Sequence, residues 1–178
     1  AASDVYKRQL SYIESVKSYP ENIEARHVKT YRSSDNESGF VSMELNNSMI
    51  LLPKKPMKRR YFDERVGWFT TSQTDYGIDN QEAKTIKYLD RWRLEVKDKD
   101  IEKFKAGELV EPKKPIVYYI DPGTPKKWRK YLKQGIEDWQ VAFEAAGFKN
   151  AIIAKDPPSK DEDPDWSPED VRYSVVRY

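Results

Sequence analysis

The chain has 178 residues, enough for one large domain or two small ones, with 38% hydrophobic and 35% charged residues. Its 32 basic residues nearly balance 30 acidic ones, for a net charge of +2, so no overall field favours nucleic acid or membrane. The sequence has no cysteine, which excludes disulfides, thiolate metal sites and cysteine nucleophiles, and no apolar run approaches the roughly 20 residues of a membrane-spanning helix.

Residues 10–52 are predicted to be mostly strand. The apolar residues of 10–18 recur at a weakly helical spacing, so a short helix is expected there, and 19–22 (YPEN) interrupts it. Residues 40–45 alternate apolar and polar side chains, as a half-buried strand does. The Asn-rich segment 46–48 is expected to turn the chain into a second strand at 49–52, which gives a hairpin. Two further elements complete this region: a strand at 23–32 and a polar turn at 33–39.

Residues 53–114 combine strand patterns with charged loops. The basic, proline-bounded segment 53–60 is expected to be a loop. Residues 85–96 give the clearest strand pattern, although Asp90 interrupts its apolar face. The charged segment 97–114 contains Gly107 and Pro112 and is expected to hold a flexible boundary. The other expected elements are a strand at 65–72 with a bulge at Gly67, turns at 74–80 and a short helix at 101–106.

The segment 115–178 is predicted to form a strand, a long helix, a strand, an acidic loop and a final strand. Residues 116–120 (IVYYI) are an apolar run typical of a buried strand. We expect Thr124 to cap the following helix with its hydroxyl, Pro125 to occupy the first helical position and Gly147 to end the helix in a left-handed conformation. Further strands are expected at 151–154 and 171–178.

On a helical wheel, residues 125–146 divide into an apolar and a polar side. We expect the apolar side to face the core, with its Trp128, Trp139 and Phe143 stripe as packing material and Gly135 allowing another element to approach closely. The apolar side comprises Trp128, Leu132, Gly135, Ile136, Trp139, Ala142, Phe143 and Ala146; the polar side comprises Lys126, Arg129, Lys130, Lys133, Gln134, Glu137, Gln140 and Glu144.

Two long stretches resemble a known family. The run PIVYYIDPGTPKKWRKYLKQGIEDWQVAFEAAGFKNAII at 115–153, followed by DPDWSPEDVRYSVVRY at 163–178, resembles the start of the catalytic domain of bacterial metzincin-type zinc-dependent peptidases of the EcxA-like group. Upstream, SMILLPKKPMKRRYFDERVGWFT and YLDRWRLE are similar to the uncharacterised domain that precedes that catalytic domain, and the looser similarity extends to about Tyr19.

The resemblance implies a parent enzyme that hydrolyses peptide bonds with a zinc-activated water and that is secreted or periplasmic. Such enzymes hold zinc with three histidines of a His-Glu-x-x-His-x-x-Gly-x-x-His run, whose Glu is the general base. This chain has one histidine, His27, and lacks that run, so no catalytic, metal or cofactor residue is carried over. We expect the chain to stop before the active-site helix and to act as scaffold only.

The resemblance also implies that 171–178 pairs with 116–120 on the side opposite 151–154. In that order 171–178 is an edge strand, and only Arg172 and Arg177 guard it with charge. Unpaired edge strands invite a partner strand. We therefore expect the fragment to self-associate through 171–178.

Five groups of residues are candidate sites. A lone His27 in a strand is expected to be a partly exposed strand residue and not a ligand. Asp161, Asp163 and Asp165 alternate like the opening of a calcium loop, but Trp166 and Arg172 stand where that loop needs Gly and Glu. A solvated loop, with Asp165 or Ser167 capping a turn, is therefore favoured over a weak calcium contact.

The basic cluster is favoured as a solvated loop with local ion pairs over a nucleic-acid or lipid site. It comprises Lys54, Lys55, Lys58, Arg59 and Arg60. Arg59, Asp63, Arg65 and Trp68 match the upstream family stretch without a known role, and an ion pair between Asp63 and an arginine is expected. Glu137 and Asp138 are adjacent on a polar helix face and do not face each other, which excludes an acid/base pair.

The sequence thus predicts an α+β fold in three parts. A β-rich domain of unknown function at 10–100 is followed by a linker at 101–114 and by the first half of a metzincin-like mixed-sheet domain at 115–178. Residues 1–9 (AASDVYKRQ) resemble translated sequencing-adapter read-through and are left out of the prediction. The partner of the parent enzyme would be a protein or peptide substrate. The alternatives are a non-catalytic protein-interaction module and, more distantly, nucleic-acid binding through 54–60.

Overall fold

The computed structural model describes residues 10–33, 39–79 and 81–178 and has the expected α+β fold, with antiparallel and parallel strand pairs. The expectations for 1–9, for the interior of the turn at 33–39 and for Asn80 lie outside the described residues. In chain order the elements are β1 (Tyr12–Ser18), β2 (Asn22–Arg32), β3 (Phe40–Ile50), β4 (Thr70–Asp75), β5 (Lys84–Leu89), η2 (Asp98–Asp100), α1 (Ile101–Lys105), β6 (Ile116–Ile120), α2 (Lys126–Glu137), α3 (Gln140–Ala145), β7 (Ile152–Lys155) and β8 (Ser174–Val176).

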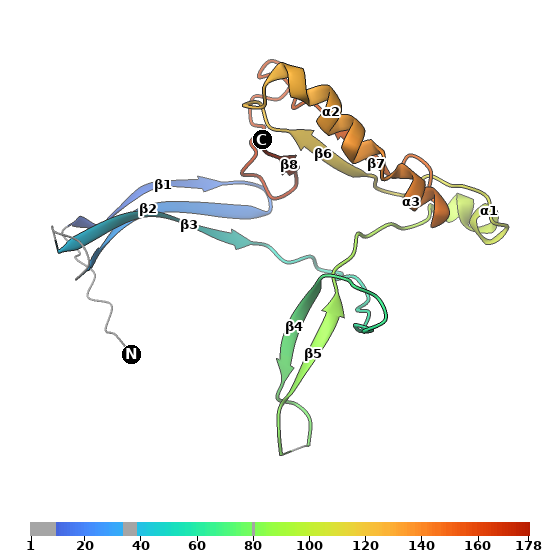
Figure 1. Cartoon of the computed structure of the whole chain (residues 1–178), viewed down its shortest axis with the longest axis horizontal. Coiled ribbons are helices and arrows are strands. Elements are labelled where there is room, and N and C mark those ends of the chain that lie inside the picture. Colours follow the sequence, from blue (N-terminus) through green and yellow to red (C-terminus); the bar gives the residue numbers. More distant parts are fainter. Residues whose placement is uncertain (1–9, 34–38, 80) are drawn as a thin grey trace. The chain divides into compact units, whose positions relative to one another are not determined.

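β1 is a strand where the sequence predicts a short helix, so that prediction is wrong. It pairs antiparallel with β2, the central strand of the sheet β1-β2-β3 (Figure 1). The register shifts between Ile13 and Ser15, which is the mark of a β-bulge. In a regular strand, every second side chain points to the same face. The extra residue of the bulge lengthens that interval to three, so Ile13 and Val16 point to the same face of β1. The bulge thus produces the spacing that imitates a helix.

β3 continues through 46–48, so the predicted turn and hairpin at this point are wrong. Asn46 and Asn47 pair with Arg26 and Ala25 of β2 in an unbroken antiparallel register. The Asn46 amide and the Ser48 hydroxyl donate to the Glu24 carboxylate, both at 2.6 Å. These contacts with the neighbouring strand outweigh the local turn preference of the Asn-rich segment.

β4 and β5 form an antiparallel hairpin (Figure 1) that is shorter than the sequence predicts. Of the strand expected at 65–72, only 70–72 belong to β4. The strand expected at 85–96 ends at Leu89, immediately before Asp90, the residue that interrupts its apolar face. The Asp90 amide donates to the Phe69 carbonyl at 3.0 Å and its carboxylate accepts a bond from Thr71 at 2.8 Å. These bonds close the open end of the hairpin.

The chain forms two compact units. One contains the described residues up to Leu52 together with Val117–Glu137 and Ala154–Tyr178; the other contains Pro53–Ile116 and Asp138–Ile153. The core of the second unit is a cluster of Val110, Phe148 and Ala151. Leu94, Val96, Phe104 and Phe143 pack against this cluster.

Gly147 ends α3 in the left-handed conformation that the sequence predicts, with φ of +91°. The Phe148 amide donates to the Phe143 carbonyl at 2.8 Å, and the Gly147 amide donates to the Glu144 carbonyl at 2.9 Å. These two bonds define a Schellman motif, and the apolar contact that accompanies it is made by Phe143 and Phe148 around the buried cluster. The helix end is therefore fixed by both backbone and core.

The start of α2 differs from the prediction. Thr124 is buried, but its hydroxyl has no hydrogen-bond partner in the described part of the chain, so the predicted side-chain cap is wrong. The Arg129 guanidinium instead donates to the carbonyls of Thr124 and Pro122, at 2.9 and 2.8 Å. The helix begins at Lys126, one residue after Pro125. A cation in the first turn thus fixes the loop before the helix.

The single helix expected at 125–146 is interrupted at Asp138 and Trp139, between α2 and α3. Polar groups on either side of the break bond to the backbone around β7. The Glu137 carboxylate accepts a bond from the Ala154 amide at 3.2 Å. The Gln140 side chain accepts from the Ala151 amide at 2.9 Å and donates to the Phe148 carbonyl at 3.1 Å. Two residues assigned to the solvent side therefore satisfy backbone groups.

The aromatic stripe predicted to be core is largely exposed, which corrects that expectation. Trp128 is 40% exposed and Trp139 is 64% exposed, whereas Phe143 packs against the cluster around Val110. Trp128 stacks on Tyr178, with ring centroids 6.5 Å apart. No atom lies within 4 Å of where a Cβ on Gly135 would be, so the close approach expected there is absent. Two of the three aromatic residues in the stripe are therefore exposed to solvent.

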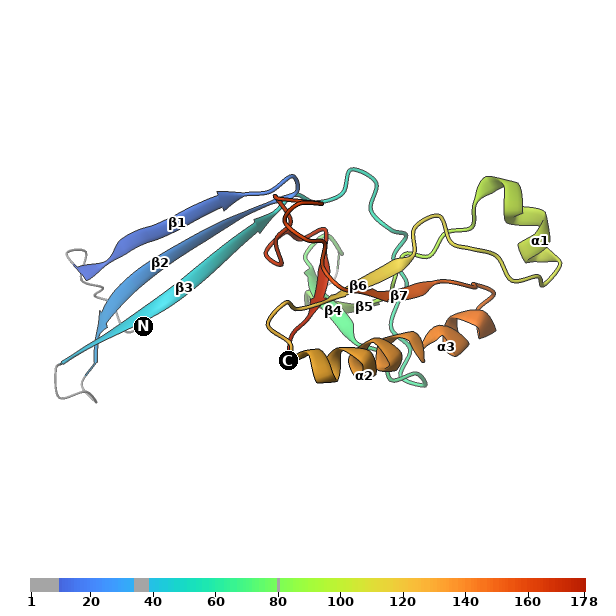
Figure 2. The same cartoon turned by 90° about the horizontal axis from the view of Figure 1, so that it is seen from above.

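β6 lies between β7 and β8, as the resemblance implies, and pairs in parallel with β8. Figure 2 shows β6 beside β7. The predicted strand at 116–120 is confirmed, and the strand expected at 151–154 is present as β7, shifted by one residue. β8 spans only Ser174–Val176 of the strand expected at 171–178. It remains an edge strand of this sheet. Self-association through that edge stays a prediction.

The domain limits at 10–100, 101–114 and 115–178 stay predictions, and proteolysis can test the linker. Val110 is 3% exposed, and its backbone bonds to Gly147 and Lys149 at 3.1 and 3.0 Å. These anchors lead us to expect that limited trypsin digestion cuts first in the basic loop at 53–60, detected by mass spectrometry of the first products. First cuts within 97–114 would instead establish the flexible linker.

Candidate functional site

The described residues do not fit a zinc site. Within 10–33, 39–79 and 81–178, no three His, Cys, Asp or Glu side chains are grouped so that they could hold a metal ion. The only histidine of the sequence, His27, lies on the central strand β2 and is 9% exposed, more buried than expected. No catalytic step through a metal is therefore derived from this chain's own residues.

The acidic segment forms local turns. The Asp163 carboxylate accepts a bond from the Asp165 amide at 3.2 Å, and the Ser167 hydroxyl accepts one from the Glu169 amide at 3.2 Å. Ser167 thus caps a turn as the sequence predicts. Backbone and side-chain bonds from Ser159 lower the pKa of the Glu162 carboxyl. These contacts describe a loop that satisfies its own polar groups.

The acidic segment ends in an ion-pair cluster centred on Glu169, which we call the Glu169 cluster. Its carboxylate accepts bonds from the Lys17 ammonium at 2.8 Å, the Arg26 guanidinium at 2.9 Å and the Tyr19 hydroxyl at 3.0 Å. The Tyr19 hydroxyl also lies 3.0 Å from the Ser167 hydroxyl. The cluster joins β1 and β2 to a residue that lies 152 positions after Lys17 and 143 positions after Arg26.

Asn22 provides a second connection beside the Glu169 cluster. Its amide nitrogen donates to the Glu169 carbonyl at 2.9 Å, and its amide oxygen accepts a bond from the Val171 amide at 3.0 Å. The same nitrogen donates to the Glu24 carboxylate at 2.6 Å. Asn22 is 4% exposed, so each of these bonds satisfies a group that has little access to water.

Electrostatics in this region favour ionised carboxylates. The hydrogen bond from Lys17 is the largest cause that lowers the pKa of Glu169, with Tyr19 and the charge of Arg26 contributing. The Arg172 guanidinium lowers the pKa of Asp170, which is 1% exposed and accepts bonds from Arg172 at 2.6 to 3.1 Å. Ser48 and Asn46 lower the pKa of Glu24. The region is built to hold negative charge by direct pairing.

The basic loop at 53–60 lies beside β4 and β5. The Arg59 guanidinium lies 4.7 Å from the centre of the Tyr88 ring and donates to Gln73 at 3.1 Å. Arg91 and Arg93 donate to the carbonyls of Lys58 and Lys55, at 2.8 and 2.9 Å. Among the five cations of the basic cluster, Arg59 makes these local contacts, and Arg91 and Arg93 hold the backbone of the loop. The local ion pairs that the sequence favours for the cluster stay a prediction.

Two further expectations concern the Asp63–Arg65 ion pair and Glu137. Arg65 makes two side-chain bonds to Asp63, at 2.8 and 2.6 Å, which confirms the expected ion pair. The Arg65 side chain is 88% exposed, so the pair contributes little to stability. The second expectation is that Glu137 does not form an acid/base pair with another carboxyl group. The Glu137 carboxylate accepts a hydrogen bond from the Ala154 amide.

The Glu169 cluster is what sequence reasoning missed. Lys17, Tyr19 and Arg26 belong to no motif, and Glu169 lies in the run at 163–178 that resembles the peptidase family but has no role assigned there. Each residue by itself is an ordinary surface type. The nearest available signal is that Glu169 belongs to the acidic run at 161–170, whereas the first two strands carry several cations. Only the folded chain brings these groups together.

The fold and these contacts define an α+β protein whose N-terminal sheet is bound by ion pairs to Glu169 in a turn before β8. The family model described as "Domain of unknown function (DUF5117)" matches residues 2–97, more than half of the chain, and the chain belongs to this family. Neither the comparison with curated proteins nor the comparison with solved structures found a match. Among the described residues, no helix is long and apolar enough to cross a membrane.

Proposed function

We propose that the chain is the scaffold part of a bacterial zinc-dependent peptidase, with the DUF5117 region placed before the first half of a metzincin-like catalytic domain. The observation that carries the proposal is the order β7-β6-β8, with α2 and α3 between β6 and β7 in the chain. This is the strand–helix–strand–strand arrangement that the resemblance of 115–178 implies. The proposed parent is secreted or periplasmic, binds zinc through residues outside this chain and cleaves a protein or peptide.

The test compares two proteins. The first is the 178-residue chain, which we expect to retain no stoichiometric zinc after dialysis and to leave labelled casein uncut, because one histidine cannot supply the ligands of a zinc site. The second is the chain extended by its natural downstream sequence, in which we expect one zinc ion per chain and metal-dependent cleavage of casein.

Two results would contradict the proposal. One is a downstream sequence without His-Glu-x-x-His within about 100 residues of Tyr178. The other is submicromolar zinc binding by the 178-residue chain alone, which would require a carboxylate site that the described residues lack. A matched control for the extended protein replaces the Glu of that motif by Gln, which should keep zinc and abolish cleavage.

A second candidate function is a non-catalytic module that binds protein. It is favoured by large aromatic side chains exposed in and next to the β4–β5 hairpin: Phe69 is 88% exposed, Tyr76 is 84% exposed and Trp68 is 46% exposed. Exposed aromatic groups are typical of contact surfaces. A natural stop codon soon after Tyr178 would support this function in place of the peptidase.

A further inference from the structure

The sheet β1-β2-β3 has two edge strands, and the chain protects them differently. β1 has a bulge between Ile13 and Ser15 and carries the charged residues Glu14 and Lys17, features that keep another strand from pairing with an edge. β3 has 11 residues, pairs with β2 without a register shift, lacks proline and carries one charged residue, Glu44. Within the part of the chain that the structure describes, no strand pairs with the outer edge of β3.

The backbone of β3 directs alternate residues to this outer edge. One position beyond each end of the β2–β3 pairing, the Leu51 amide donates to the Glu21 carbonyl at 2.8 Å, and the Ser33 amide donates to the Gly39 carbonyl at 3.1 Å. Both bonds join odd-numbered residues, so the odd-numbered residues of β3 bond to β2 and the even-numbered ones direct their N–H and C=O groups away from it. The outward-directed residues include Ser42, Glu44, Asn46 and Ser48. Such groups are available to an added strand.

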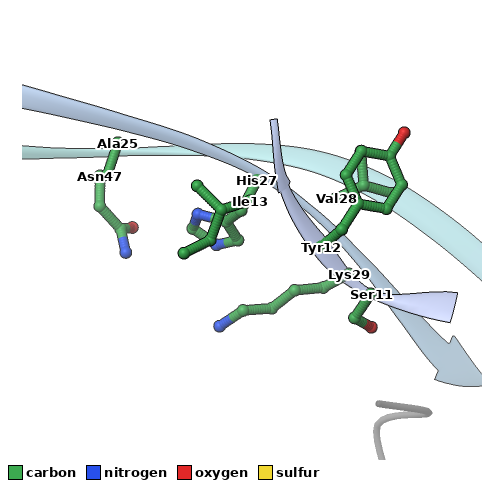
Figure 3. A pocket seen from close by; sticks show the side chains of 8 residues that line it. All are labelled: Ser11, Tyr12, Ile13, Ala25, His27, Val28, Lys29 and Asn47. Atoms are coloured by element: carbon green, nitrogen blue, oxygen red, sulfur yellow. The ribbon is translucent and has the colours of Figure 1, made fainter. Parts of the chain in front are cut away.

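The odd-numbered side chains of β3 lie on one face of the sheet, and most of them are apolar. Figure 3 shows Ile13 of β1, His27 of β2 and Asn47 of β3 on the same side of the strands. The apolar residues of β3 on this face are Val41, Met43, Leu45 and Met49. Three of these four side chains are 38% to 58% exposed. An added strand would therefore gain apolar cross-strand contacts as well as backbone hydrogen bonds.

The sequence of β3 complements itself in one register. A second copy related by a twofold axis would run antiparallel to the first. An axis beside Leu45 places the outward even-numbered residues opposite one another and pairs the whole strand. Glu44 then lies opposite Asn46 of the second copy, whereas an axis beside Glu44 would place the two carboxylates opposite each other. An axis beside Asn46 would leave Phe40 and Val41 opposite no residue of β3.

We propose that the outer edge of β3 binds β3 of a second copy of this chain, antiparallel about Leu45, so that two three-stranded sheets become one continuous sheet. Leu45 lies opposite Leu45 of the second copy and Val41 lies opposite Met49, which joins the two apolar faces. This edge is distinct from that of β8, and the proposal is independent of the peptidase function.

A single introduced thiol tests the register, because the sequence has no cysteine. In the proposed dimer the two Leu45 residues form a non-hydrogen-bonded pair with Cα atoms about 4.5 Å apart, within the range that a disulfide bridges. Leu45→Cys should therefore form a disulfide-linked dimer under mild oxidation by oxidised glutathione. The control is Val16→Cys on the same face of β1, where the side chain is 61% exposed, and it should cross-link about tenfold more slowly.

Charged variants at Leu45 test the same contact without oxidation. Sedimentation equilibrium of the 178-residue chain should show a dimer with a dissociation constant on the order of 100 μM, as expected for a small interface of one strand pair. Leu45→Lys and Leu45→Glu should each weaken the dimer about tenfold, because like charges lie opposite each other. An equimolar mixture of the two should associate more tightly than either variant alone. Circular dichroism establishes that each variant is folded, and Leu45→Met is the uncharged control.

Three results would overturn the proposal: a monomer at every concentration, equal cross-linking of Leu45→Cys and Val16→Cys, or no recovery in the mixture of charged variants. A dimer joined through β8 alone would give the second result. The protein extended by its natural downstream sequence tests another occupant of the edge. If Leu45→Cys cross-links in the 178-residue chain but not in the extended protein, a segment of the parent pairs with β3, and the proposal of a second copy is wrong.

Discussion

Replacing Gly147 with alanine is expected to destabilise the protein by about 2–5 kcal/mol. The residue has φ of +91°, a conformation in which a side chain costs about 1–2 kcal/mol. An added Cβ would lie 2.5 Å from Cε2 of Phe104, a ring that packs against the Val110 cluster, and relieving such a contact in a packed core costs about 1–3 kcal/mol more. Urea unfolding, followed by circular dichroism, measures the loss.

Gly135→Ala is the matched control for this substitution. Gly135 lies inside α2, and no atom lies within 4 Å of the position that a Cβ would occupy. The same chemical change should therefore stabilise the protein by about 0.5–1 kcal/mol, because alanine favours the helix. If the two variants were equally stable, the Schellman motif at Gly147 and its contact with Phe104 would both be refuted.

Glu169→Gln is expected to destabilise the protein by about 1–2 kcal/mol at pH 7. The substitution removes the charge that Lys17 and Arg26 pair with, and the value is reduced from that of buried pairs because the lysine and arginine side chains are 53% and 40% exposed. Asp161→Asn, a neutralisation of an exposed residue in the same acidic segment, should have no measurable effect on urea unfolding.

The Glu169 cluster also predicts how stability depends on pH. The pKa values of Glu169, Asp170 and Glu24 are all lowered by folding, so the folded chain binds fewer protons than the unfolded chain as the solution becomes acidic. Their contribution is complete above the ordinary carboxyl pKa values of 4.5 and 3.8 and is lost as pH falls below them. Urea unfolding between pH 7 and 3 should show this loss.

Glu169→Gln separates one carboxylate from the others in that titration. The difference in stability between the variant and the unmodified chain should be largest at pH 7 and should shrink as the pH falls through the lowered pKa of Glu169. A difference that stayed constant down to pH 3 would show that folding does not lower the pKa of Glu169.

The elements that the sequence predicts well have local causes. The apolar run at 116–120 forms β6, the short helix expected at 101–106 forms α1 and Gly147 ends α3. Each depends on neighbours within a few residues: a continuous apolar segment, helix-favouring residues, or a glycine able to adopt positive φ. Such preferences act before any tertiary contact forms.

The sequence patterns misled where a distant segment satisfies the backbone. Asn46–Ser48 has the composition of a turn, yet Glu24 and the ladder of β2 hold it in a strand. Trp128 and Trp139 occupy the apolar side of the helix, yet that side stays largely exposed while Gln140 bonds to the backbone at Ala151. A prediction from the hydrophobic pattern alone leaves out the backbone hydrogen-bond donors and acceptors that need partners.

By itself, the sequence determined the α+β class, the left-handed end of the helix at Gly147, and the absence of enough histidines for a zinc site. The tertiary structure alone decided the Glu169 cluster and the environment of His27. Both depend on register: which residue of β1 or β3 lies opposite which residue of β2, and which distant segment reaches the sheet. Strand register depends on all the contacts between neighbouring strands together, and these contacts cannot be read from any one short stretch of sequence.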